Sequence, residues 1–130
     1  MISTNYEYNQ IKGAFAKSLK TLRLYVGFSL VDLEKLTGIN NPSLSRYENG
    51  KVEPSLTQAV IIAENFQLTV EDFILFGLGL KPENTDCLDI IDYFNQKLVD
   101  IIASMGENSE KLLRQLYKGI DFDSLIKNFL

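Results

Sequence analysis

Between residues 41 and 49 the chain carries polar side chains whose types and spacing suit hydrogen bonding to DNA bases. Arg46 has a planar guanidinium that can pair with two acceptors on guanine, which contributes about 1–3 kcal/mol of discrimination. Asn41 could pair with adenine in a similar way, unless its side chain caps the helix. Asn41 and Pro42 would begin the helix, and Ser45 and Arg46 would follow one turn later. The pattern predicts a short helix, residues 41–49, whose outer face enters a major groove and reads base edges.

Other polar residues around this helix are better placed for phosphate oxygens. Serine hydroxyls, amide groups, a lysine and the backbone N–H groups at a helix start can all donate hydrogen bonds to phosphate. The candidates for phosphate contact are Ser29, Ser43, Asn49 and Lys51. Three of them also have a simpler interpretation, since Ser43 fits a first helical turn, Asn49 a helix end and Lys51 a solvated loop.

A second short helix is predicted directly before this one. Ser29 and Asp32 have the three-residue spacing of a capping box, which marks a helix start. The helix that follows would bury Leu33 and Leu36. Gly38 can adopt the left-handed conformation that ends a helix. Two short helices joined by a tight turn are therefore expected.

The start of helix 41–49 has two possible caps. Asn40 and Asn41 are both favourable N-cap residues, and Pro42 is tolerated in a first turn. A proline disfavours the α conformation in the residue before it, which favours Asn41 as the cap. At the other end of the helix, Gly50 is expected to terminate it.

Short runs in this region resemble the phage-repressor-like (Cro/CI, or XRE) helix-turn-helix family. The run S-R-Y-E-N-G-K at residues 45–51 resembles the exit of that family's recognition helix, and T-G-I at residues 37–39 resembles its turn. L-K-T-L-R at residues 19–23 resembles the end of its first helix. The resemblance covers residues 11–77. It implies an all-α fold in which five helices form the DNA-binding domain of a transcriptional regulator.

The resemblance also assigns roles to individual residues. It implies that Arg23 and Glu48 form a buried ion pair that holds the fold, so neither is expected to read DNA. Three residues depart from the family pattern. Leu30 replaces a common phosphate-binding glutamine, Glu34 replaces a small residue, and Glu53 adds negative charge after the recognition helix. The side chain of Glu34 is expected to point to solvent, and the other two departures weaken the expected grip on phosphate.

The chain has 130 residues and a formal net charge of −4, which is unfavourable for a nucleic-acid-binding protein. The charges are unevenly distributed along the sequence. Residues 10–55 hold seven basic and four acidic residues, whereas residues 56–130 hold six basic and twelve acidic residues. The positive excess lies on the predicted DNA-binding half. Because this excess is small, we expect modest non-specific affinity and dependence on a dimer.

The predicted organisation is a helix-turn-helix domain at residues 1–77, a linker with glycine and proline at residues 78–85, and a helical hairpin at residues 86–130. Apolar residues of the hairpin follow the three-and-four spacing of a packing seam. The hairpin has more apolar surface than it can bury alone, so it must pack on the first domain or on a second copy. We favour dimerisation. The expected contact residues are Ile91, Phe94, Leu98, Ile101, Met105 and Leu116.

Composition disfavours several classes of protein. The chain has no histidine and no phosphate-binding glycine loop, so neither an enzyme nor a bound metal or cofactor is expected. The single cysteine, Cys87, cannot form an internal disulfide, and the polar N-terminus does not resemble a signal peptide. No apolar run approaches the roughly 20 residues of a membrane span. These features predict a cytoplasmic protein.

The leading functional hypothesis is a dimeric transcriptional repressor that binds double-stranded DNA through helix 41–49. One alternative is an antitoxin that uses the same domain on DNA and binds a partner protein through its C-terminal helices. Another is an adaptor that keeps the fold but does not bind DNA, which Leu30 and Glu53 favour.

Overall fold

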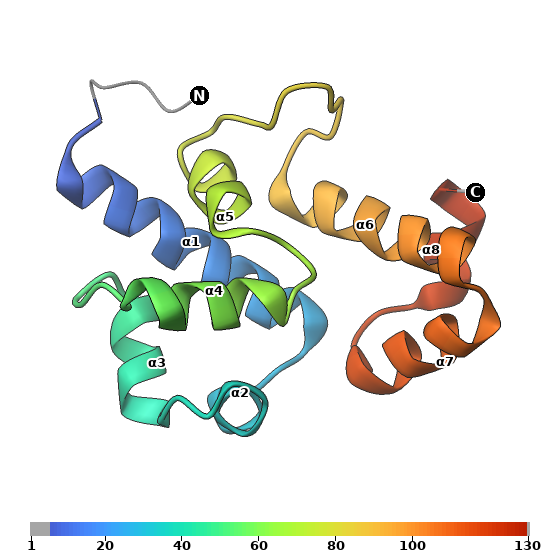
Figure 1. Ribbon diagram of the computed structural model, residues 1–130, viewed down its shortest axis with the longest axis horizontal. Coiled ribbons are helices and arrows are strands. Elements are labelled where there is room, and N and C mark those ends of the chain that lie inside the picture. Colours follow the sequence, from blue (N-terminus) through green and yellow to red (C-terminus); the bar gives the residue numbers. More distant parts are fainter. Residues whose placement is uncertain (1–5, 130) are drawn as a thin grey trace.

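The structure is a computed structural model that describes residues 6–129, and within this range it holds eight helices and no strand. The helices are α1 (Tyr8–Val26), α2 (Leu30–Thr37), α3 (Asn41–Glu48), α4 (Leu56–Glu64), α5 (Val70–Gly77), α6 (Ile90–Met105), α7 (Glu107–Leu116) and α8 (Phe122–Phe129). Figure 1 shows α2 and α3 along the lower side of the molecule, α1, α4 and α5 above them, and α6–α8 at the right. The predicted all-α fold is confirmed.

The cap residues of α2 act as the sequence predicted. The N–H of Asp32 donates to Ser29 Oγ at 3.0 Å, and the N–H of Ser29 donates to Asp32 Oδ2 at 2.8 Å. Gly38 ends the helix with a left-handed backbone, at φ 75°. Leu33 is fully buried, but Leu36 is 40% exposed, contrary to the prediction. Leu36 lies outside the core because it lines a surface groove between α2 and α7.

The N-cap of α3 is Asn40, so the preference for Asn41 was wrong. Asn40 has an extended backbone, and its Oδ1 accepts a hydrogen bond from the N–H of Ser43 at 2.8 Å. Asn41 is the first helical residue, and its N–H donates to Glu34 Oε1 at 2.8 Å. This bond anchors the first turn from outside the helix, and it outweighs the unfavourable effect of Pro42 on the residue before it.

Three helices, not a two-helix hairpin, follow the coil that begins after α5. Gly106 both ends α6 and precedes α7, whereas Ser109, which we expected as the cap of α7, lies inside its first turn. The chain leaves α7 at Tyr117 and turns before α8 begins at Phe122. The predicted final helix is broken here because Tyr117 turns into the core, where it is fully buried.

The C-terminal helices share one hydrophobic core with the first five helices. Aromatic rings bridge the two parts: Phe66 lies 6.4 Å from Phe94, and Tyr117 lies 5.8 Å from Phe28 and 5.2 Å from Phe94, measured between ring centroids. The hydroxyl of Tyr117 also donates to the carbonyl oxygen of Asn65. The apolar face of α6 is therefore covered within the same chain.

This packing corrects part of the predicted dimer surface. Phe94 and Leu98 have no exposed surface, since they belong to the shared core and cannot contact a second copy. Ile91, Ile101 and Leu116 are half-buried against that core. Met105, at the end of α6, is 70% exposed.

Candidate nucleic-acid interface

Helix α3 is held by one face and leaves the other open. Leu44 is fully buried and Tyr47 is 8% exposed. The hydroxyl of Tyr47 donates to Gln58 Oε1 of α4 at 2.6 Å. Because these contacts fix the helix from its inner side, the opposite face is presented in a single orientation to solvent.

The four predicted base-reading residues lie at the start and middle of α3. Pro42 and Arg46, one turn apart, are exposed, and Asn41 and Ser45 beside them are half-buried. Within the described residues Arg46 has no ion-pair partner. The side-chain amide of Asn41 is not used in the cap, since Asn40 fills that role. The arrangement leaves a guanidinium and an amide available to hydrogen-bond to base edges.

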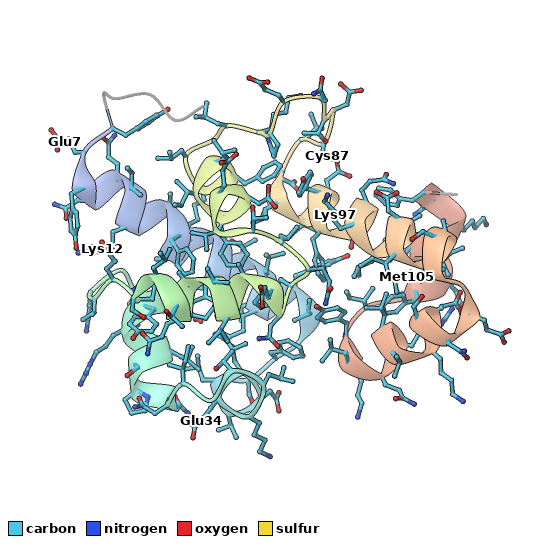
Figure 2. The ribbon with its side chains drawn as sticks, in the orientation of Figure 1. Glu7, Lys12, Glu34, Cys87, Lys97 and Met105 are labelled. Atoms are coloured by element: carbon cyan, nitrogen blue, oxygen red, sulfur yellow. The ribbon has the colours of Figure 1, made fainter. Side chains whose placement is uncertain are left out.

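Glu34 takes part in the turn between α2 and α3, contrary to the prediction that it points away to solvent. Its side chain is half-buried, and Oε1 accepts the N–H of Asn41. Figure 2 shows Glu34 at the lower edge of the molecule, where α2 and α3 meet. A carboxylate at a helix start also interacts favourably with the positive end of the helix dipole. The first N–H of α3 is thus used internally, which leaves the side chains of this helix to make contacts outside the protein.

The predicted phosphate-contact residues surround α3 without forming one cluster. Asn49 and Lys51 are exposed just beyond the end of α3, and Ser43 is half-buried in its first turn. Asn49 Nδ2 approaches Ser45 Oγ at 3.4 Å, a weak contact. These residues lie on the recognition-helix side of the molecule, where phosphates would flank the groove.

The start of α2 is the weakest part of the predicted phosphate clamp. Ser29 is exposed, but its hydrogen bonds to Asp32 hold a carboxylate beside it and lower the pKa of that carboxylate. Leu30, the first residue of α2, packs against the core and offers no donor. Asp32 is therefore ionised at neutral pH, and its negative charge opposes a phosphate at this position.

The ion pair between Arg23 and Glu48 is present. Arg23 Nε and Nη2 donate to the two carboxylate oxygens of Glu48, both at 2.7 Å, and Nη1 donates to the carbonyl oxygen of Phe28 at 2.8 Å. The two side chains are 13% and 6% exposed. The bonds to Glu48 raise the pKa of Arg23. Arg23 therefore ties α1 to α3 and to the turn before α2, and all three of its guanidinium nitrogens bond within the domain.

No group of histidine, cysteine or acidic side chains in residues 6–129 could hold a metal ion. No helix in this range is both long and apolar enough to cross a membrane.

The order of helices, the capped turn and the buried ion pair define a class of DNA-binding domain. Residues 19–73 match the family model described as helix-turn-helix. This segment is a helix-turn-helix domain, similar to those of the Cro/CI-like (XRE) family. A similar protein is the antitoxin PezA of Streptococcus pneumoniae, which is 29% identical over 102 residues. The alignment covers 78% of this chain and 58% of that relative, and no solved structure matches.

Proposed function

We propose that this protein is a sequence-specific DNA-binding transcriptional regulator that reads its operator through α3. The observation that carries the proposal is the exposed pair Pro42 and Arg46 on a helix whose opposite face is anchored in the core. In this arrangement α3 lies in the major groove and α2 crosses the backbone. Arg46 is the main base reader, and Asn41 and Ser45 make additional contacts.

We further propose that two copies bind together. Helix-turn-helix dimers read half-sites about one helical turn, or 34–36 Å, apart. A single copy has little positive charge to offer, so a second copy is needed for useful affinity. Occupation of the operator would exclude polymerase, which makes repression the simplest outcome.

The test is binding of labelled DNA by the full chain, measured by fluorescence anisotropy across a range of salt concentrations. The probes are duplexes that the protein selects from a random-sequence pool and a scrambled duplex of equal composition. Loss of a bidentate arginine contact corresponds to about 5- to 150-fold weaker binding, or 1–3 kcal/mol. We therefore expect Arg46→Glu to remove the preference for the selected duplex.

A matched charge reversal, Lys127→Glu at an exposed position of α8, should leave that preference intact. Both variants should unfold at the wild-type urea concentration, since neither side chain is buried. Failure to select any duplex would favour the adaptor hypothesis over a regulator.

A second candidate function is that of an antitoxin, which an observation beyond the DNA-binding domain supports. The relative PezA is an antitoxin by name. Its 102 aligned residues exceed those of the helix-turn-helix segment 19–73, so the similarity extends into other parts of this chain. Met105 at the end of α6 and Leu112 in the middle of α7 are 70% and 65% exposed, which gives apolar surface for a protein partner.

Co-expression with the product of the neighbouring gene distinguishes the two functions. If the protein is an antitoxin, it should rescue growth, and Leu112→Glu should lose the rescue while Arg46→Glu keeps it. Substitution is preferable to truncation after Asn84, because truncation would remove Phe94 and Tyr117 from the shared core. A neighbouring product that is harmless and does not co-purify would contradict the antitoxin proposal.

A further inference from the structure

The turn between α7 and α8 lies directly against the turn between α1 and α2. A Cβ placed on Gly119 would lie 2.6 Å from the carbonyl oxygen of Val26, and one on Gly27 would lie 3.5 Å from the Cα of Gly119. The two backbones therefore touch, and any side chain at position 119 would push them apart. This contact holds the α7–α8 turn beside the N-terminal end of α2, the helix that crosses the DNA backbone in this class of domain.

The contact brings together lysines that are far apart in the sequence. Lys35 of α2 and Lys118 of the α7–α8 turn line the same surface groove, and both are exposed. Their charges also act on Asp32: after the hydrogen bonds from Ser29, these two lysines contribute to the lowered pKa of that carboxylate. Lys35, in the last turn of α2, and Lys118 thus both lie close enough to Asp32, in the first turn of that helix, for their charges to act on it.

Helix α7 adds a third lysine on the same side. Lys111 is exposed and lies four residues before Gln115, which lines the groove, so the two share one face of α7. In Figure 1, α7 lies on the lower side with α2 and α3, whereas the coil before α6 runs along the upper side. That coil and α6 carry the acidic residues Asp86, Asp89, Asp92 and Asp100. The acidic C-terminal half therefore presents Lys111 and Lys118 where it borders α2, although α7 also carries Glu107 and Glu110 in its first turn.

We infer that Lys118, with Lys35 and Lys111, forms a second phosphate-binding contact for DNA, supplied largely by the C-terminal helices. The inference rests on the proposed DNA-binding function. At the start of α2, Leu30 offers no side-chain donor, and Asp32 repels phosphate. Lys118 lies beside the same helix end and provides the positive charge that α2 lacks there, because a lysine binds phosphate as a point charge on a flexible stem. The DNA footprint then extends beyond residues 19–73 to α7.

The test uses the full chain and two labelled duplexes of equal length and composition, one selected by the protein from a random pool and one scrambled. Phosphate contacts act on both sequences, and each one contributes about 0.9 to the slope of log K against log salt. We expect Lys118→Gln to weaken binding to both duplexes by about five- to tenfold near 0.1 M salt, and to reduce the slope by about 0.9. The ratio of the affinities for the two duplexes should not change.

Three further variants make this result specific. Lys118→Arg keeps the positive charge, so it should show the affinity and the salt slope of the wild type. Lys81→Gln removes another exposed lysine, from the coil before α6, and should change neither the affinity nor the slope. Arg46→Glu should bind the selected and the scrambled duplex with similar affinity. This loss of preference is a readout separate from the slope. Urea unfolding of each variant confirms that the fold is intact.

The outcomes separate this inference from the function on which it rests. Wild-type affinity and slope in Lys118→Gln, together with lost discrimination in Arg46→Glu, would overturn the inference and leave the proposed function standing. Absence of binding to any duplex would overturn both. If Lys118→Gln kept DNA binding but lost a co-purifying acidic protein, the lysines would belong to a protein interface and the inference would be wrong.

Discussion

At the scale of single residues, the buried ion pair is the contact whose loss should be most damaging. Arg23 and Glu48 have no other charged partner within the described residues, and both are nearly buried. Arg23→Ala leaves the Glu48 carboxylate uncompensated, so we expect a loss of about 3–5 kcal/mol in the free energy of unfolding. Replacing both residues with apolar ones, in Arg23→Met with Glu48→Leu, should be much less destabilising.

Urea unfolding followed by circular dichroism measures both changes. The control is Arg114→Ala, which breaks more solvent-exposed ion pairs with Glu110 and Asp123 and should lower the midpoint far less than Arg23→Ala does. A double variant as unstable as Arg23→Ala alone would mean that the damage comes from lost packing around Arg23 rather than from the unpaired charge.

At the scale of elements, the start of α3 places a structural role on Asn40 and a proposed DNA-binding role on the adjacent Asn41. Asn40→Ala removes the side-chain cap and should cost about 1 kcal/mol of stability. Asn41→Ala keeps both the cap and the backbone bond to Glu34, so the stability should change little. Only Asn41→Ala should alter which duplexes the protein prefers. Thermal unfolding and anisotropy on the selected duplex distinguish the two variants, and equal destabilisation would contradict the assignment.

Local signals in the sequence predicted the elements of the DNA-binding half well. Capping boxes and helix-ending glycines act between residues a few positions apart, so Ser29, Asp32 and Gly38 could be assigned without tertiary contacts. The choice between Asn40 and Asn41 could not be made in this way. It depends on Glu34, which approaches Asn41 only after α2 and α3 have packed together. The ion pair was predicted from the family resemblance, since nothing local links positions 23 and 48.

The C-terminal half was predicted less well, because its signals depend on distant partners. The three-and-four spacing correctly marked α6 as amphipathic, but it could not identify the surface that covers its apolar face. That surface is provided by the first five helices. The break after Leu116 was also missed, since Tyr117 leaves the helix to reach a carbonyl group on the other side of the core. The candidate base-reading residues and the lysines around Lys118 remain proposals.

At the scale of the whole molecule, Tyr117 reports whether the two halves are packed together. Its burial raises the pKa of the phenol to about 12, from the ordinary value of 10.0. A raised pKa in the folded state means that the stability supplied by the neutral phenol is complete below pH 10 and decreases as the pH rises through 12. The wild type should therefore lose stability between these values more steeply than Tyr117→Phe. Urea midpoints measured from neutral to alkaline pH give both curves.

The comparison isolates Tyr117 because the other five of the six tyrosines are common to both proteins. Tyr117→Phe should itself be less stable at neutral pH by about 1–3 kcal/mol, because the carbonyl group of Asn65 loses its buried donor. If the urea midpoints of the wild type and Tyr117→Phe fell in parallel as the pH rose, the phenol would be accessible to solvent and the halves would separate readily.

The aromatic bridge between the halves also determines how long each of them survives in a cell. Proteases act on segments that have opened, and segments that share a core open together. Here Phe28, Phe66, Phe94 and Tyr117 form one continuous contact across both halves. Degradation that begins at α6–α8 therefore removes the helix-turn-helix domain as well. The two halves of the molecule then have a single common lifetime.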